Sequence, residues 1–100
     1  MVTCEVGDSG ASVAVKITGA ADVGSAHALY EELTVLVTPG RDVTIELDAV
    51  DCLDGAGVQL LIALKAFVER SGGTFRVAAS AEVPLQALRL AEASALFGLS

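Results

Sequence analysis

Four aspartates, Asp22, Asp48, Asp51 and Asp54, are the residues of this chain whose type and spacing could do chemistry together. They could converge where predicted strands give way to loops, and clustered carboxylates can bind Mg²⁺ or accept a phosphoryl group. The alternative is that Asp48 and Asp51 solvate a loop while Asp54 caps a helix. We favour this alternative, and expect no metal site, because no catalytic lysine or second set of ligands lies at suitable spacing.

The single histidine and the glycines next to Asp54 provide no catalytic or cofactor motif. His27 lies between two alanines in the first turn of a predicted helix, without a cluster of partners, and is expected to be a solvated helix residue. No serine lies in a G-x-S-x-G elbow. Gly55-Ala56-Gly57 lacks the third glycine and the following lysine of nucleotide-binding loops. We therefore expect no enzymatic activity and no cofactor.

Asp54 stands between a predicted strand and a predicted helix. Residues 43–47 alternate apolar and polar side chains, which is the period-2 pattern of a strand buried on one face. After the turn of residues 54–57 the apolar positions take helical spacing, at Leu60, Leu61, Leu64, Phe67 and Val68. The glycines allow a sharp turn, and Asp54 can accept hydrogen bonds from the free N–H groups of the first helical turn.

The chain before this unit predicts a hairpin and a helix. Residues 2–6 and 13–17 alternate as two short antiparallel strands around a glycine-containing turn. Residues 25–37 place apolar side chains at helical spacing, with Ser25 as the expected N-cap and Pro39-Gly40 as the stop signal.

The chain after it predicts a last strand and a last helix. Residues 74–79 form the strand, and Ser80 is the expected cap of a helix that has Pro84 in its first turn. Residues 95–99 are expected to fold back onto the body. The order β-β-α-β-α-β-α predicts an α/β fold with a mixed sheet, because β-α-β units impose parallel neighbours beside an antiparallel edge. The helices are expected mainly on one face.

Composition excludes several classes of partner. A chain of 100 residues is the size of one domain, which we expect to span residues 1–100. Its net charge of −7 repels nucleic acid and anionic lipid. The sequence has no apolar run of the roughly 18 to 20 residues that span a bilayer, and no leader-like N-terminus, so a cytoplasmic location is expected. Cys4 and Cys52 lie in apolar stretches and are predicted to be buried free thiols.

Three motifs follow one another in a recognisable order: Gly19 and Asp22 after the second strand, then Asp54, Ala56, Gly57 and Val58, then Ser71, Gly72 and Gly73 before the last strand. In this order they resemble the STAS domain family, named for sulfate transporters and anti-sigma factor antagonists, over nearly the whole chain. The family places Asp-Ser/Thr-Ser/Ala/Thr-Gly-Leu/Val at the start of the helix. The resemblance implies a bacterial, non-enzymatic interaction module that regulates transcription or signalling.

The chain departs from this signature at Gly55. In the antagonist branch of the family that position is the Ser or Thr that a partner kinase phosphorylates, and glycine has no hydroxyl. A phosphate there would add roughly −1.5 to −2 charge at the start of a helix. Ala56 is equally inert, so we expect no phosphorylation switch in this turn.

The resemblance also implies where a partner docks. The expected docking residues are Asp22, Asp54, Gly55, Ala56, Gly57, Val58, Gln59 and Ile62. Here the glycines and Ala56 would allow close backbone approach. Val58 and Ile62 would form an aliphatic strip outside the core, although the alternative is that they widen the core face. The expected partner is a serine-kinase-like anti-sigma factor or another regulatory protein, and homodimer formation stays open.

A second function stays open beside the first. The run Ala56-Gly57-Val58-Gln59-Leu60-Leu61 is similar to variants found in STAS accessory subunits of lipid-transport ABC complexes and in components beside chemotaxis kinases. The identity of co-purifying proteins distinguishes the two functions.

Overall fold

The computed structural model of this chain describes residues 2–8, 12–36 and 40–97. The described part holds a mixed four-stranded sheet in the order β1-β2-β3-β4. The strands are β1 (Val2–Asp8), β2 (Ser12–Ala21), β3 (Asp42–Leu53) and β4 (Thr74–Ala78). β1 pairs with β2 antiparallel, and the other two pairs are parallel. The α/β fold and its mixed sheet, predicted from the alternating patterns, are therefore confirmed.

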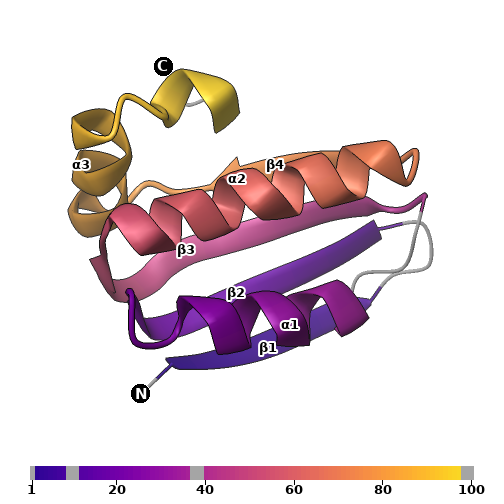
Figure 1. The fold of residues 1–100 in the computed structure, drawn as a ribbon, viewed down its shortest axis with the longest axis horizontal. Coiled ribbons are helices and arrows are strands. Elements are labelled where there is room, and N and C mark those ends of the chain that lie inside the picture. The colour runs from indigo at the N-terminus through magenta and orange to yellow at the C-terminus, as the bar shows by residue number, and fades with distance from the viewer. Residues whose placement is uncertain (1, 9–11, 37–39, 98–100) are drawn as a thin grey trace.

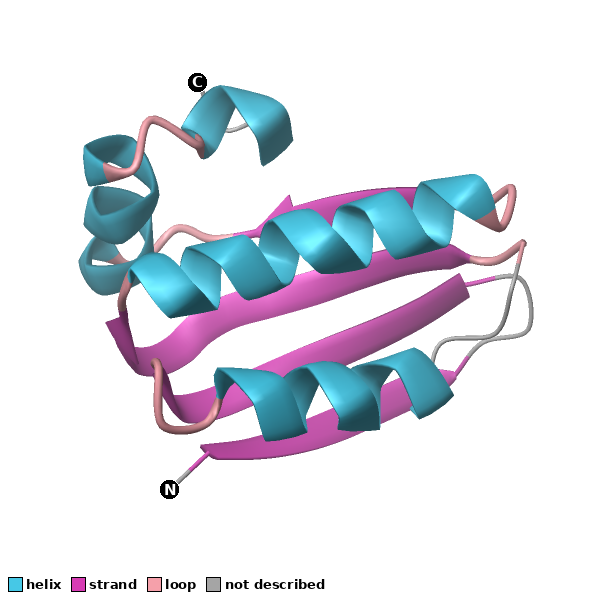
Figure 2. Ribbon diagram, viewed as in Figure 1, coloured by secondary structure: helices cyan, strands magenta, loops and turns pink. Residues whose placement is uncertain are grey.

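Three α-helices connect and follow these strands. They are α1 (Ala26–Leu36), α2 (Gly55–Arg70) and α3 (Glu82–Leu90), and a short 3₁₀ helix η1 (Ser94–Phe97) comes after them. Figure 1 shows α1 and α2 lying across one face of the sheet, and α3 beside the start of α2. The layers are visible in Figure 2, where the helices cover one side of the strands. The predicted ends of the first helix at Val37 and Pro39 lie outside the described residues.

The core lies between the sheet and these helices. Its central strand residues, all 2% exposed or less, are Val13, Val15, Ile17, Val43, Ile45 and Leu47. They meet Leu29 and Leu33 of α1 and Leu61 and Leu64 of α2. Each such side chain contributes roughly 1.5–3 kcal/mol by leaving water. The intervening strand residues, such as Lys16 and Glu46, are exposed on the other face, so one sheet face is covered as expected.

β3 runs well beyond its predicted end. The register between β2 and β3 shifts between Lys16 and Thr18 and again between Gly19 and Ala20. Each shift inserts one extra residue into β3, which changes the side toward which the following residues point. Val50 and Leu53 are consequently the next buried positions. Asp48 and Asp51 therefore lie in a strand, and the expectation that they solvate a loop is wrong.

Ser25 directly precedes α1 as predicted, and its carbonyl accepts from Leu29 N–H at 2.9 Å, whereas the predicted Ser80 cap of α3 is wrong. Ser25 Oγ donates to the carbonyl of Ala20 at 2.8 Å and accepts from Asp22 N–H at 3.2 Å, so it closes the β2–α1 loop. α3 has Ala81 as its N-cap, with no side-chain capping bond. Pro84 lies in the first turn of α3 as predicted, and is buried.

Asp48 of β3 binds the two residues just before α3. Its Oδ1 accepts hydrogen bonds from Ser80 N–H at 2.7 Å and Ala81 N–H at 2.9 Å, and its Oδ2 accepts from Ser80 Oγ at 2.8 Å. The Ala81 N–H, then the Ser80 N–H and hydroxyl, lower the pKa of Asp48. A strand residue thus fixes the start of α3 against β3.

The C-terminal segment folds back as predicted as far as Phe97. This side chain is buried, and its ring lies 6.1 Å from that of Phe75, tilted by 54°. Gly98 and Leu99 lie outside the described residues. Both cysteines are free thiols: Cys4 is half-buried, which raises its pKa, whereas Cys52 is exposed. The expectation of burial is wrong for Cys52, which lies on β3 between the buried positions Val50 and Leu53.

Within the described residues, the helices are too short or too polar to cross a bilayer.

Candidate functional site

Asp54 joins two loops at one end of the sheet. It is the N-cap of α2, where its Oδ1 accepts a hydrogen bond from Gly57 N–H at 3.0 Å. Its Oδ2 accepts from Val23 N–H in the β2–α1 loop, also at 3.0 Å. The Gly57 N–H, aided by that of Val23, lowers the pKa of Asp54. The predicted cap is confirmed, and both carboxylate oxygens have partners within the chain.

Asp22 shapes the second of these loops. Its Oδ1 accepts from Gly24 N–H at 3.1 Å and lies 3.3 Å from Ser25 Oγ. Its carbonyl accepts from Ser25 N–H and Ala26 N–H, which starts α1. Since Val23 next to it bonds to Asp54, the structure brings the Asp22 loop and the 54–57 turn together as expected.

The four aspartates weighed above as a possible carboxylate cluster do not form a shared site. Asp54 is engaged by the start of α2 and the β2–α1 loop, whereas Asp48 is engaged by the start of α3. Within residues 2–8, 12–36 and 40–97, no group of three His, Cys, Asp or Glu side chains is arranged to hold a metal ion. His27 is exposed on α1 and pairs with Glu31, as expected of a solvated helix residue.

The two glycines of the turn have opposite surroundings. Gly55 is exposed, and a Cβ built on it meets no atom within 4 Å. Gly57 is buried, and a Cβ there would lie 2.2 Å from the Ala21 carbonyl oxygen and 2.6 Å from a methyl of Leu53. The expectation that both glycines admit a partner is therefore wrong for Gly57, because Ala21 of the same chain occupies that space.

The expected docking residues on the helix also differ in their exposure to solvent. Val58 is 3% exposed and belongs to the core, so the alternative that it widens the core face holds. Ile62 is half-buried against the same core. Gln59 is exposed and Ala56 is half-buried. The surface that remains at this end consists of Gly55, Gln59 and the β2–α1 loop, where Val23 is 79% exposed.

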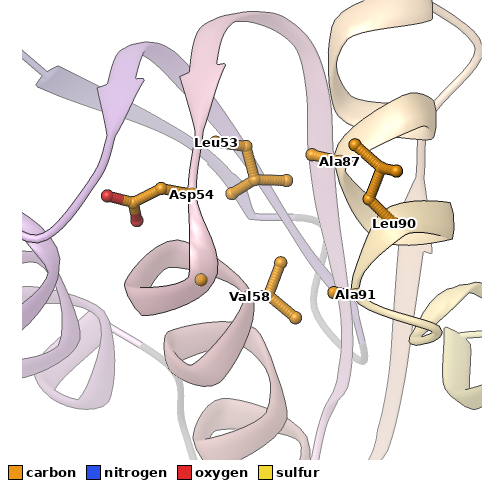
Figure 3. A pocket seen from close by; sticks show the side chains of 7 residues that line it. Leu53, Asp54, Val58, Ala87, Leu90 and Ala91 are labelled. Atoms are coloured by element: carbon orange, nitrogen blue, oxygen red, sulfur yellow. The ribbon is translucent and has the colours of Figure 1, made fainter.

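An apolar groove beside the turn was not predicted. Leu53 and Val58 form one wall, and Ala87, Leu90 and Ala91 of α3 form the other, with Asp54 and Gly55 at the rim; we call it the α2–α3 groove. Figure 3 shows the two walls facing each other while the Asp54 carboxylate points away. The sequence signal was the spacing of Val83, Ala87 and Leu90 at i, i+4 and i+7, beside the buried pair Pro84 and Leu88.

Comparison with known families identifies the fold. The family model described as "Mlab, STAS domain" matches residues 4–98, almost the whole chain. The chain belongs to the STAS domain family. The predicted resemblance is confirmed.

Solved STAS structures share this architecture. An anti-sigma factor antagonist from Mycobacterium paratuberculosis is 24% identical, with a TM-score of 0.85 over 98% of this chain and 84% of the other. The antagonist SpoIIAA in its unphosphorylated form is 10% identical, with a TM-score of 0.76 over 93% of this chain and 84% of the other. At these identities the likeness shows the fold. No protein with a curated description matches the chain.

Proposed function

We propose that this STAS domain is a non-enzymatic interaction module of the anti-sigma factor antagonist type. In this proposal it docks a serine-kinase-like anti-sigma factor in the cytoplasm. The contact surface is the 54–57 turn, the start of α2 and the β2–α1 loop. The observation that carries the proposal is the exposed, side-chain-free Gly55 at the start of α2. The fold shared with solved antagonists supports it.

The surface is pre-organised by the chain's own hydrogen bonds. Asp54 links the start of α2 to Val23, and Asp22 closes the loop that carries Val23. Because these loops are already fixed, a partner loses little conformational entropy in ordering them. What they present outward is backbone at Gly55 and side chains at Val23 and Gln59, which favours recognition by shape.

Docking in this proposal is independent of phosphorylation in the turn. Neither Gly55 nor Ala56 has a hydroxyl, so no phosphate can be added at either residue. A phosphate would bring roughly −1.5 to −2 charge to this surface. Control of binding then comes from protein abundance, from competing partners or from another site.

The test uses the intact domain with a purified serine-kinase anti-sigma factor and ATP. Calorimetry is expected to show a complex, and mass spectrometry of the 54–57 peptide is expected to show no phosphate. Gly55→Asp should weaken the complex by blocking close approach. Gly7→Asp is the matched control, since Gly7 is exposed on β1 and a Cβ there meets only the Ala14 oxygen at 3.9 Å. Phosphate in the turn, or normal binding by Gly55→Asp, contradicts the proposal.

A second candidate is an accessory subunit of a lipid-transport ABC complex or of a chemotaxis kinase assembly. The run of residues 56–61 favours it. It uses the same surface with a different partner. Stable co-purification with a membrane ATPase or a chemotaxis kinase, and no complex with the anti-sigma factor, decides in its favour.

A further inference from the structure

Helix α3 carries more apolar surface than the core covers. Pro84 and Leu88 are buried against the sheet. A second stripe, Val83, Ala87 and Leu90, follows i, i+4 and i+7 spacing on a neighbouring face. Leu90 is 79% exposed and Val83 46%. Burial of a leucine side chain lowers the free energy, and an exposed apolar stripe on a helix is typical of an interface. This second stripe therefore indicates a contact outside the domain.

The α2–α3 groove has the size for aliphatic side chains. Its volume is about 320 Å³, roughly twice that of a 150 Å³ apolar cavity that binds benzene. The walls are Leu53 and Val58 on one side and Ala87, Leu90 and Ala91 on the other. A groove between two helices accepts a third helix through residues one turn apart, a known mode of recognition.

The charged residues around the groove indicate the charge of the partner segment. Residues 18–26, 47–58 and 79–92, which surround this end of the molecule, contain the acidic residues Asp22, Asp48, Asp51, Asp54, Glu82 and Glu92. Arg89 is the one basic residue among them. Arg41, Arg70 and Arg76 lie at the opposite end, where β3 begins and α2 ends. The resulting field attracts a cationic segment and repels anionic lipid, nucleic acid and a second acidic copy of the chain.

We infer that the α2–α3 groove binds a basic amphipathic helix of the partner protein. Two aliphatic side chains one turn apart enter the groove, and flanking Lys or Arg residues face the acidic residues around it, such as Glu82 at the start of α3 and Glu92 just after its end. The inference rests on the proposed function, to which it adds a second contact surface next to Gly55 and the chemistry of the partner. Leu90 covers the inserted side chains and is the residue of α3 with most apolar area to lose.

The first test is a binding experiment with a synthetic peptide. The peptide is a helix of about 18 residues, long enough to form a helix, with leucines at i and i+4 and flanking lysines and arginines. Amide shifts in NMR spectra of the intact domain are expected at Leu53, Val58, Ala87, Leu90 and Ala91. The affinity is expected to fall as salt rises, and a peptide with glutamates in place of the basic residues should not bind.

Variants of the domain make the test specific. Leu90→Ser is expected to weaken peptide binding roughly tenfold, the loss that follows from one unburied leucine. Val35→Ser is the matched control, because Val35 is 84% exposed on α1, away from the groove, and its substitution should leave the affinity unchanged. Equal weakening by both variants overturns the inference, as do shifts confined to other surfaces or equal affinity for the acidic peptide.

Binding to the anti-sigma factor separates this inference from the proposed function. If both hold, Gly55→Asp and Leu90→Ser each weaken that complex. If Leu90→Ser binds normally while Gly55→Asp does not, the groove is not an interface and the turn remains one. If Gly55→Asp binds normally, the proposed docking through the turn is wrong, whatever the peptide does.

Discussion

Gly55 and Gly57 lie two residues apart in one turn, but the space around them differs. At Gly57 the chain itself takes the space of a side chain, since the Ala21 carbonyl oxygen would lie 2.2 Å from a Cβ. At Gly55 no atom lies within 4 Å of that position. The first glycine of the motif faces solvent, and the second allows the start of α2 to approach the end of β2.

The difference teaches how to assign a glycine to folding or to binding. Glycine in a helix is less favourable than alanine by roughly 0.5–1 kcal/mol, because it loses more backbone freedom on folding. Gly57 offsets this cost by close packing within the domain. Gly55 makes no such close packing contact, and its φ lies outside the left-handed range that requires glycine. A contact with another molecule is the use that remains for it.

The largest effect expected from this comparison is that of Gly57→Ala. The added methyl overlaps the Ala21 backbone and Leu53, and backbone atoms cannot rotate away as a side-chain end can. Overpacking of this kind should lower the free energy of unfolding by about 3 kcal/mol. Urea unfolding followed by circular dichroism measures it. A loss of less than about 0.5 kcal/mol, typical of surface substitutions, would mean that Gly57 does not serve the close approach.

A pH effect tests the hydrogen bonds that fix the two loops. The pKa of Asp54 and of Asp48 is lowered in the folded protein, in each case chiefly by a backbone N–H bond. A depressed carboxyl pKa stabilises the fold above the unfolded value of about 3.9, and this stabilisation is lost as the pH falls through the folded pKa. Stability should therefore drop below about pH 4.

The matching variants sharpen this prediction. Asp54→Asn and Asp48→Asn should each be less stable at neutral pH than the wild type, and each should lose part of the acid dependence. The double variant should have the flattest profile when urea midpoints are measured between about pH 2.5 and pH 7. An unchanged profile in the double variant would show that other carboxyls cause the acid sensitivity.

The fold was predictable from local patterns where those patterns are regular. The alternation in residues 43–47 and the stripe from Leu60 to Val68 each repeat with one period, and both elements formed as expected. The extension of β3 to Leu53 was not predictable, because two register shifts break the alternation. Asp48 was likewise missed as the anchor of α3, since Ser80 and Ala81 are more than 30 residues away.

The candidate site, like the fold, could be predicted only in part. The Asp54 cap involves neighbours in sequence and could be predicted. The contrast between Gly55 and Gly57 depends on Ala21, and the α2–α3 groove depends on α3 packing beside the start of α2. Such contacts join residues distant in sequence. The spacing of Val83, Ala87 and Leu90 indicates an apolar stripe, but a single sequence does not show which element lies beside it.

The smallest effect, and the most informative about Gly55, is expected from Gly55→Ala. With open space and a compatible backbone, the methyl should raise the free energy of unfolding by about 0.5 kcal/mol, chiefly by restricting the unfolded chain. Gly72→Ala is the matched control, because a Cβ there also meets nothing within 4 Å but φ is +88°; it should lose about 1 kcal/mol. If Gly55→Ala is also destabilised, the fold itself requires glycine at this position. A more stable Gly55→Ala that binds the anti-sigma factor less tightly would instead mean that the glycine is kept for the partner, at a cost to the domain's own stability.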